Sequence, residues 1–378
     1  MRWFPLAIVV AFASACAHRQ AVAPPPAQPI IYVPPTIITP KDDETPTQKF
    51  ERARALLIDG KGAEAAGLFD QLARDESTGP IGPLASFNAG VAWEQAGDRE
   101  GALSRFRSTA ERHPTGDVGK FAVIRAARLH AHLEQWSQLS AVADLLLART
   151  DLTQVEKLEA FGAKALAVVE AGDADAADRF IAKGRDIIDV LRLGEGGKLP
   201  LEVAQIHFAL GEVRRLRGEA IVFVPLPPNF ADALERRCQL LLDAQSAYSD
   251  AMRSYDAHWA AMSGFRVGEL YQKLHKDVMS IPPPRTASTT GDKRLFEGAM
   301  RLRYRVLLEK GLKMMEHTVM VGERTGEASP WIDRARAARR EIELALNEQK
   351  ERIAKLPYTE KELQKALDDL AATAKNRP

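Results

Sequence analysis

The chain has 378 residues, with 52 Lys and Arg against 51 Asp and Glu, a formal net charge of +1, and 2 cysteines. A charge this close to zero argues against a protein that holds nucleic acid electrostatically, so no nucleic-acid partner is expected. Two cysteines are too few for a disulfide framework.

The first residues, 1–15, have the pattern of a secretory signal peptide. Arg2 supplies a positive start, an apolar run extends to Ala13, and Ala13-Ser14-Ala15 is a small-residue cleavage site. The apolar run is shorter than the roughly 20 residues that a transmembrane helix needs. No second apolar run follows, so the mature chain is not expected to span a membrane.

Two interpretations of the cleavage site remain open. Ala13-Ser14-Ala15 fits ordinary signal peptidase, which would release a soluble periplasmic protein. The residues Ala13 to Cys16 also resemble the lipobox of bacterial lipoproteins, although Ala13 stands where that motif usually carries Leu. The resemblance implies that Cys16 is acylated and that its lipid anchor holds the protein in a membrane. Because Ala17 follows rather than Asp, we favour an outer-membrane lipoprotein facing the periplasm.

Residues 16–46 are rich in proline, from Pro24 to Pro46, and carry almost no charge before Lys41. Such a segment favours extended polyproline conformations over a packed core. At about 3.1 Å per residue it would reach on the order of 90 Å. We predict a tether that holds the following domain away from the membrane.

Residues 87–114 contain the clearest repeat. Ala89, Gly90 and Trp93 form a small-small-aromatic triplet, and Gly97-Asp98 marks a turn. The positions that follow the turn are Ala102, Phe106, Thr109 and Pro114. This segment resembles the tetratricopeptide repeat, a helix-turn-helix unit in which small residues let paired helices approach closely.

The same frame recurs along the chain. Its second-helix position falls at 65, 102, 139 and 177, which are intervals of 37, 37 and 38 residues. Four matches in phase predict a repeat array of about four units over residues 47–194. The expected fold class is all-α: a tetratricopeptide-repeat superhelix, or α-solenoid, followed by a half with longer helices.

Residues 199–378 keep a helical pattern with a looser frame and are predicted to be repeat-like. Helices are expected at 201–218, 231–254, 257–279, 292–323 and 329–354, with a short one after Thr359. The loop between the first two contains Val222, Phe223, Val224 and Leu226. These residues are a second apolar surface candidate, and their alternative role is to pack on the neighbouring helices.

The end of this half carries a looser resemblance. Residues 304–312 and 323–331, from Tyr304 to Trp331, look like the tail of repeat-containing envelope lipoproteins in gliding and predatory δ-proteobacteria. Some proteins of that kind belong to motility machines that span the envelope.

No pattern of catalytic chemistry is present. We find no His-Glu-x-x-His, P-loop or Gly-x-Ser-x-Gly motif, and Cys238 lies in a helical pattern as an expected core cysteine. We therefore expect no enzyme activity, catalytic residue, cofactor, metal site or small-molecule substrate. Two arginine-rich stretches, near Arg301 and Arg336, fit either an anionic polymer or a solvated helix face balanced by Glu.

The resemblance also predicts where a partner binds, because the first helices of such units line one groove. The matching positions are Phe50, Arg54, Phe87, Asn88, Val91, Arg125, Arg128 and His132. Asn88 would bond a peptide backbone, and Arg125 and Arg128 would bind a carboxylate such as a C-terminus. We predict a scaffold or assembly factor of an envelope machine of the secretin, pilus, barrel or gliding type. A structural binder of peptidoglycan or another envelope polymer and a soluble periplasmic adaptor are the alternatives.

Overall fold

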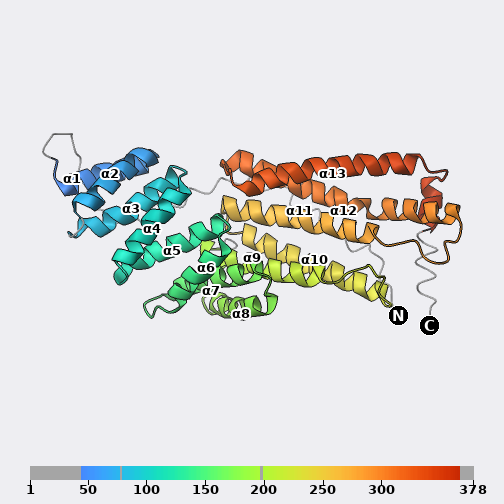
Figure 1. Cartoon of the computed structure of the whole chain (residues 1–378), viewed down its shortest axis with the longest axis horizontal. Coiled ribbons are helices and arrows are strands. Elements are labelled where there is room, and N and C mark those ends of the chain that lie inside the picture. Colours follow the sequence, from blue (N-terminus) through green and yellow to red (C-terminus); the bar gives the residue numbers. More distant parts are fainter. Residues whose placement is uncertain (1–43, 77–78, 196–198, 367–378) are drawn as a thin grey trace. The chain divides into compact units, whose positions relative to one another are not determined.

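The structure is a computed structural model that describes residues 44–76, 79–195 and 199–366. The predicted signal peptide, Cys16 and nearly all of the tether lie outside the described residues. Every regular element in the described ranges is a helix (Figure 1), so the fold class is all-α as the sequence predicts.

The helices α1 to α9 occupy Pro46–Ile58, Gly62–Asp75, Ile81–Gln95, Arg99–Arg112, Gly116–His132, Trp136–Leu147, Gln154–Glu170, Ala174–Val190 and Leu201–Glu219. The helices α10 to α13 occupy Phe230–Met252, Ala257–Met279, Thr290–Thr325 and Pro330–Ala354. A further helical segment follows Thr359, whose hydroxyl accepts a hydrogen bond from the Glu362 backbone at 3.3 Å.

The chain divides into two compact units, and the boundary between Val213 and Arg214 falls inside α9. We name Pro26–Val213 the solenoid unit and Arg214–Pro378 the C-terminal unit, and describe each by itself.

In the solenoid unit, consecutive helices pair and the pairs stack. Each helix from α1 to α7 contacts the next one along the chain. The first helices of successive pairs also contact one another, α1 with α3, α3 with α5, and α5 with α7. Contacts restricted to the neighbouring pair are the defining property of an α-solenoid.

One turn geometry joins the two helices of every pair. The residues in the left-handed region are Gly60, Gly97, Glu134 and Gly172, with φ of 79°, 86°, 56° and 92°. In each turn the next residue donates its backbone N–H to the carbonyl five residues earlier, as Asp98 does to Trp93 at 3.0 Å. This is the Schellman helix end, which favours glycine. The third turn lacks glycine, and Glu134 adopts the same conformation.

The repeat positions identified in the sequence are the buried ones. Ala65, Ala102, Leu139 and Ala177 are each 0% exposed. Gly90 lies against Phe106, and a Cβ atom on Gly90 would stand 2.6 Å from Cε1 of that ring. The small residue is therefore required by the close approach of α3 and α4.

A carboxylate connects the first two pairs. Asp70 on α2 accepts a hydrogen bond from Nε1 of Trp93 at 3.1 Å and two from Arg105, at 3.1 and 2.9 Å. Although burial raises the pKa of Asp70, these donors hold it below its usual range. Polar contacts between pairs thus supplement the apolar core.

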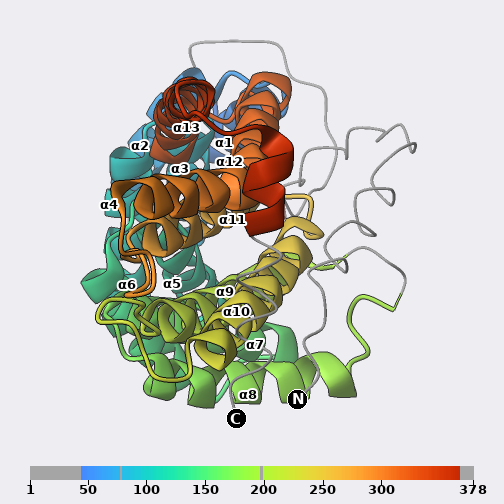
Figure 2. The same cartoon turned by 90° about the vertical axis from the view of Figure 1, so that its right-hand side faces the viewer.

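In the C-terminal unit, α11, α12 and α13 each contact the other two, and α10 packs on α11 (Figure 2). The four helices begin and end within two residues of the predicted positions. Their core contains Leu308, Met315, Ala335 and Ile342. Cys238 on α10 is half-buried rather than fully buried, and this burial raises the pKa of its thiol.

None of the helices formed by the described residues combines the length and the apolar character needed to cross a membrane.

Candidate partner-binding face

The predicted groove residues lie on three first helices that contact one another. We name this set, with its positions on α1, α3 and α5, the first-helix face. Its members are Phe50, Arg54, Phe87, Asn88, Val91, Arg125, Arg128 and His132. Because α1 contacts α3 and α3 contacts α5, the three helices place these residues on adjoining surfaces.

The apolar members are largely occupied by the core. Phe50 packs edge-on against Phe69 with ring centroids 5.2 Å apart, and Phe87 packs against Phe106 at 5.5 Å. Val91 is buried. Exposed apolar surface comes instead from Leu84, which lies one turn before Asn88 on α3 and is 46% exposed. We therefore add Leu84 to the first-helix face.

The amide of Asn88 is half-buried and donates a hydrogen bond to the Leu84 carbonyl of its own helix at 2.8 Å. Its Oδ1 atom accepts no hydrogen bond from any residue that the structure describes. One face of the amide is therefore available to a backbone N–H of a partner.

The arginines are paired with carboxylates of this chain. Arg54 donates to Glu51 at 2.8 Å, and Nη1 of Arg125 lies 3.4 Å from Glu94. Arg128 donates through Nε and Nη2 to both oxygens of Glu159, and Nη2 lies 3.4 Å from Glu202. The sequence-based role of Arg125 and Arg128, binding a partner's carboxylate, would require these contacts to open.

The pKa values of the two arginines of α5 shift in opposite directions. Burial lowers the pKa of Arg125, and the neighbouring Arg128 lowers it further, against the opposite effect of Glu94. Burial also opposes the charge on Arg128, but the Glu159 carboxylate outweighs it and raises the pKa of Arg128. The positive charge of Arg128 is thus closely paired with the Glu159 carboxylate, whereas Arg125 has one long contact with Glu94. His132 is half-buried in the last turn of α5.

Sequence reasoning missed the carboxylates of this face and Leu84. The repeat register contained the signal, because Leu84, Phe121 and Glu159 recur at intervals of 37 and 38 residues. Glu159 therefore occupies a position that is apolar in the two preceding pairs. A buried glutamate at such a position needs a cation, and Arg128 supplies it.

The second candidate, the apolar loop, divides in the structure. Phe223 is buried and packs edge-on against Phe230 with centroids 5.4 Å apart. Val222, Val224 and Leu226 are 62%, 54% and 51% exposed. One of the four residues therefore packs on the adjacent helix, and three face solvent.

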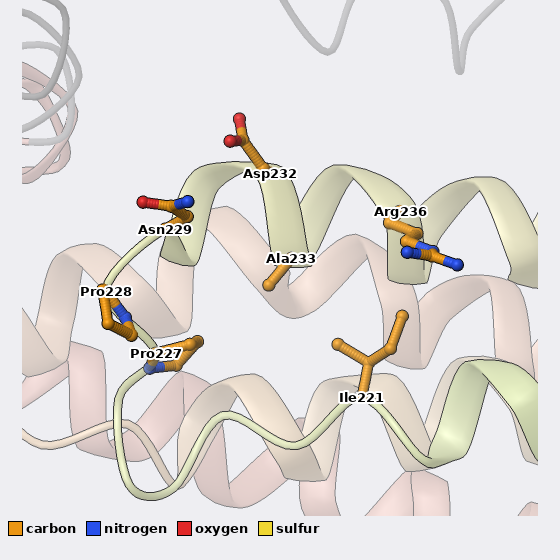
Figure 3. Close-up of a pocket in the computed structure, with 7 residues that line it drawn as sticks. All are labelled: Ile221, Pro227, Pro228, Asn229, Asp232, Ala233 and Arg236. Atoms are coloured by element: carbon orange, nitrogen blue, oxygen red, sulfur yellow. The ribbon is translucent and has the colours of Figure 1, made fainter.

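A shallow pocket of about 370 Å³ lies beside this loop (Figure 3). Ile221 and Ala233 point toward each other across it, Pro227 and Pro228 close one end, and the Asp232 carboxylate points away. Its lining combines the apolar Ile221, Pro227, Pro228 and Ala233 with the polar Asn229 and the charged Asp232 and Arg236. This mixture of groups does not define a reaction or a ligand.

Three arginines in the arginine-rich stretches of the C-terminal unit have counter-charges on their own helices. Arg305 lies 3.1 Å from Glu309, Arg336 lies 2.9 Å from Asp333, and Arg339 lies 3.7 Å from Glu343. These pairs are three or four residues apart on one helix, the spacing typical of a solvated face. They favour that interpretation over an anionic-polymer site.

No family model matches the chain, and no curated protein matches it. Among solved structures the chain is similar to a tetratricopeptide repeat protein from Parabacteroides merdae, at 14% sequence identity and a TM-score of 0.41. The similarity covers 77% of this chain and 98% of that one. The assignment to the α-solenoids accordingly stands on the helix pairs described above.

Proposed function

We propose that this chain is a non-enzymatic scaffold that binds a segment of another envelope protein on its first-helix face. The observation that carries the proposal is the contact of successive first helices, which places half-buried polar side chains and the exposed Leu84 on adjoining helices. Solenoids of this kind offer extended surfaces for binding other proteins. The fold by itself does not name the partner.

Tethering is the second part of the proposal. An acylated Cys16 and the Pro-rich segment after it would hold the solenoid in the periplasm at a distance from the outer membrane. A scaffold of a secretin, pilus, barrel or gliding assembly would work in this arrangement. A soluble periplasmic adaptor with the same face remains the alternative.

Fatty-acid labelling in the native host tests the tether. Radioactive label should enter the wild-type chain, be lost in Cys16→Ser, and fractionate with the outer membrane. A soluble, unlabelled wild-type chain would replace the lipoprotein with the soluble adaptor and leave the binding face in place.

Co-purification after gentle extraction tests the binding face. The same partner protein should be recovered with the wild-type chain and with Glu111→Arg, and lost with Leu84→Arg. Glu111 is exposed on α4, the second helix of its pair, and does not belong to the first-helix face. Equal recovery with both variants would place the interaction elsewhere on the molecule.

A further inference from the structure

The charges of the first-helix face do not match the acidic partner that its arginines suggest. Arg125 and Arg128 on α5 contact three carboxylates contributed by three other helices, which are Glu94 on α3, Glu159 on α7 and Glu202 on α9. Two positive and three negative charges leave this cluster with a formal charge of −1.

Arg128 is not available to a partner's carboxylate. Two of its nitrogens bond the same Glu159 carboxylate, whose side chain is only 5% exposed. A competing acidic group would have to leave Glu159 buried without its cation. Removing one member of a buried ion pair is far more costly than losing an exposed one.

Two carboxylates of the cluster, Glu94 and Glu202, are more exposed than Glu159. The side chains of Glu94 and Glu202 are 30% and 25% exposed, and their arginine contacts of 3.4 Å exceed an ordinary hydrogen bond. Within the described residues, Oε1 of Glu94 and Oε2 of Glu202 accept no hydrogen bond. Arg125, the one loosely held cation, is flanked by Glu94 and by the like charge of Arg128.

We infer that the first-helix face binds a partner segment that is apolar and carries Lys or Arg, and that it rejects acidic segments. Leu84 on α3 and the half-buried Phe121, which holds the equivalent position on α5, would contact the apolar side chains. Glu94 and Glu202 would receive the cations, so the charges of the two surfaces are complementary. This inference rests on the proposed function and specifies the chemistry of its partner.

Two libraries of short capped peptides test the inference with the chain of residues 17–378. Both have the same random Leu, Val and Phe positions, and one carries Lys where the other carries Glu. Fluorescence anisotropy should show tighter binding of the Lys library by at least about fivefold, the factor that corresponds to about 1 kcal/mol. Salt should weaken the Lys library more than a Gln-substituted control library.

Single substitutions test whether the preference for Lys peptides comes from the glutamates of this cluster. Glu94→Gln and Glu202→Gln should each reduce the Lys preference, whereas Glu111→Gln should leave it unchanged. Leu84→Ser should weaken both libraries, because it removes apolar contact without changing charge.

The outcomes separate this inference from the proposed function. Binding that depends on Leu84 but favours the Glu library, or neither library, would overturn the inference and leave the face as a binding site. Binding that is insensitive to Leu84→Ser, or the absence of binding, would overturn both.

Discussion

Because three hydrogen bonds to Asp70 connect the first two helix pairs, we expect the loss of this carboxylate to destabilise their contact. Replacing Asp70 with Asn keeps the size of the side chain, removes its charge, and turns an NH2 group toward donors of Trp93 or Arg105. Hydrogen bonds to a charged group contribute about 1.5–3 kcal/mol. Because the Arg105 side chain is 37% exposed and can turn to water, we expect a loss near the lower end, about 2 kcal/mol.

Hydrogen exchange is the suitable assay, because solenoids open locally and need not unfold in one step. A loss of about 2 kcal/mol corresponds to roughly 30-fold faster exchange of the most protected amides in α2, α3 and α4. Asp75→Asn is the matched control, since Asp75 is exposed at the end of the same helix. Equal exchange in the two variants would refute the role assigned to Asp70.

The pH dependence gives a second check on the same carboxylate. The pKa of Asp70 in the folded chain lies below its ordinary value of 3.8, so the unfolded chain binds the proton more readily. The contribution of the charge is therefore complete above about pH 4 and disappears as the pH falls through the folded pKa. Wild type and Asp70→Asn should differ at neutral pH and converge in stronger acid.

Three further predictions concern packing, a turn and a half-buried histidine. Gly90→Ala should destabilise the solenoid unit by about 2 kcal/mol through overpacking. Gly67→Ala is the control and should be neutral or stabilising, because a Cβ atom there meets no atom within 4 Å. Equal thermal midpoints of the two variants would contradict the close approach of α3 and α4. Gly97→Ala should cost about 1 kcal/mol in urea unfolding, because its φ of 86° strains any side chain, and an unchanged midpoint would argue against that conformation. His275 receives a 2.6 Å contact from Nε2 of Gln349, and burial followed by Arg301 lowers its pKa from 6.5 to about 4. The free energy of unfolding of the C-terminal unit should therefore fall by about 2 kcal/mol as the pH falls from 6.5 to 4, after allowance for the partial exposure of His275. This loss should be absent in His275→Gln. The same pH dependence in both chains would contradict the prediction.

Most of the helical framework was predictable from the sequence because its signals are local. The glycines at 60, 97 and 172 end the first helices, and the fully buried positions 65, 102, 139 and 177 repeat at the same intervals. Such signals need no knowledge of distant contacts. The third turn shows the limit, since Glu134 adopts a conformation that its residue type does not favour.

The candidate site was less predictable because its charges are paired across the repeats. The sequence places Arg125 and Arg128 on one helix face, but their partners Glu94, Glu159 and Glu202 are 31 to 74 residues away. Spacing along one helix cannot reveal such contacts. The repeat register could have identified Glu159, whereas Glu202 lies beyond the predicted array.

The most direct test of the central claim is site-specific photo-crosslinking in the native host. A photoreactive residue at Leu84, on the first-helix face, should yield one discrete crosslinked protein. The same residue at Glu111, on the exposed side of α4, should yield none. Crosslinks of equal intensity from both positions, or from Glu111 alone, would contradict the assignment of partner binding to the first-helix face.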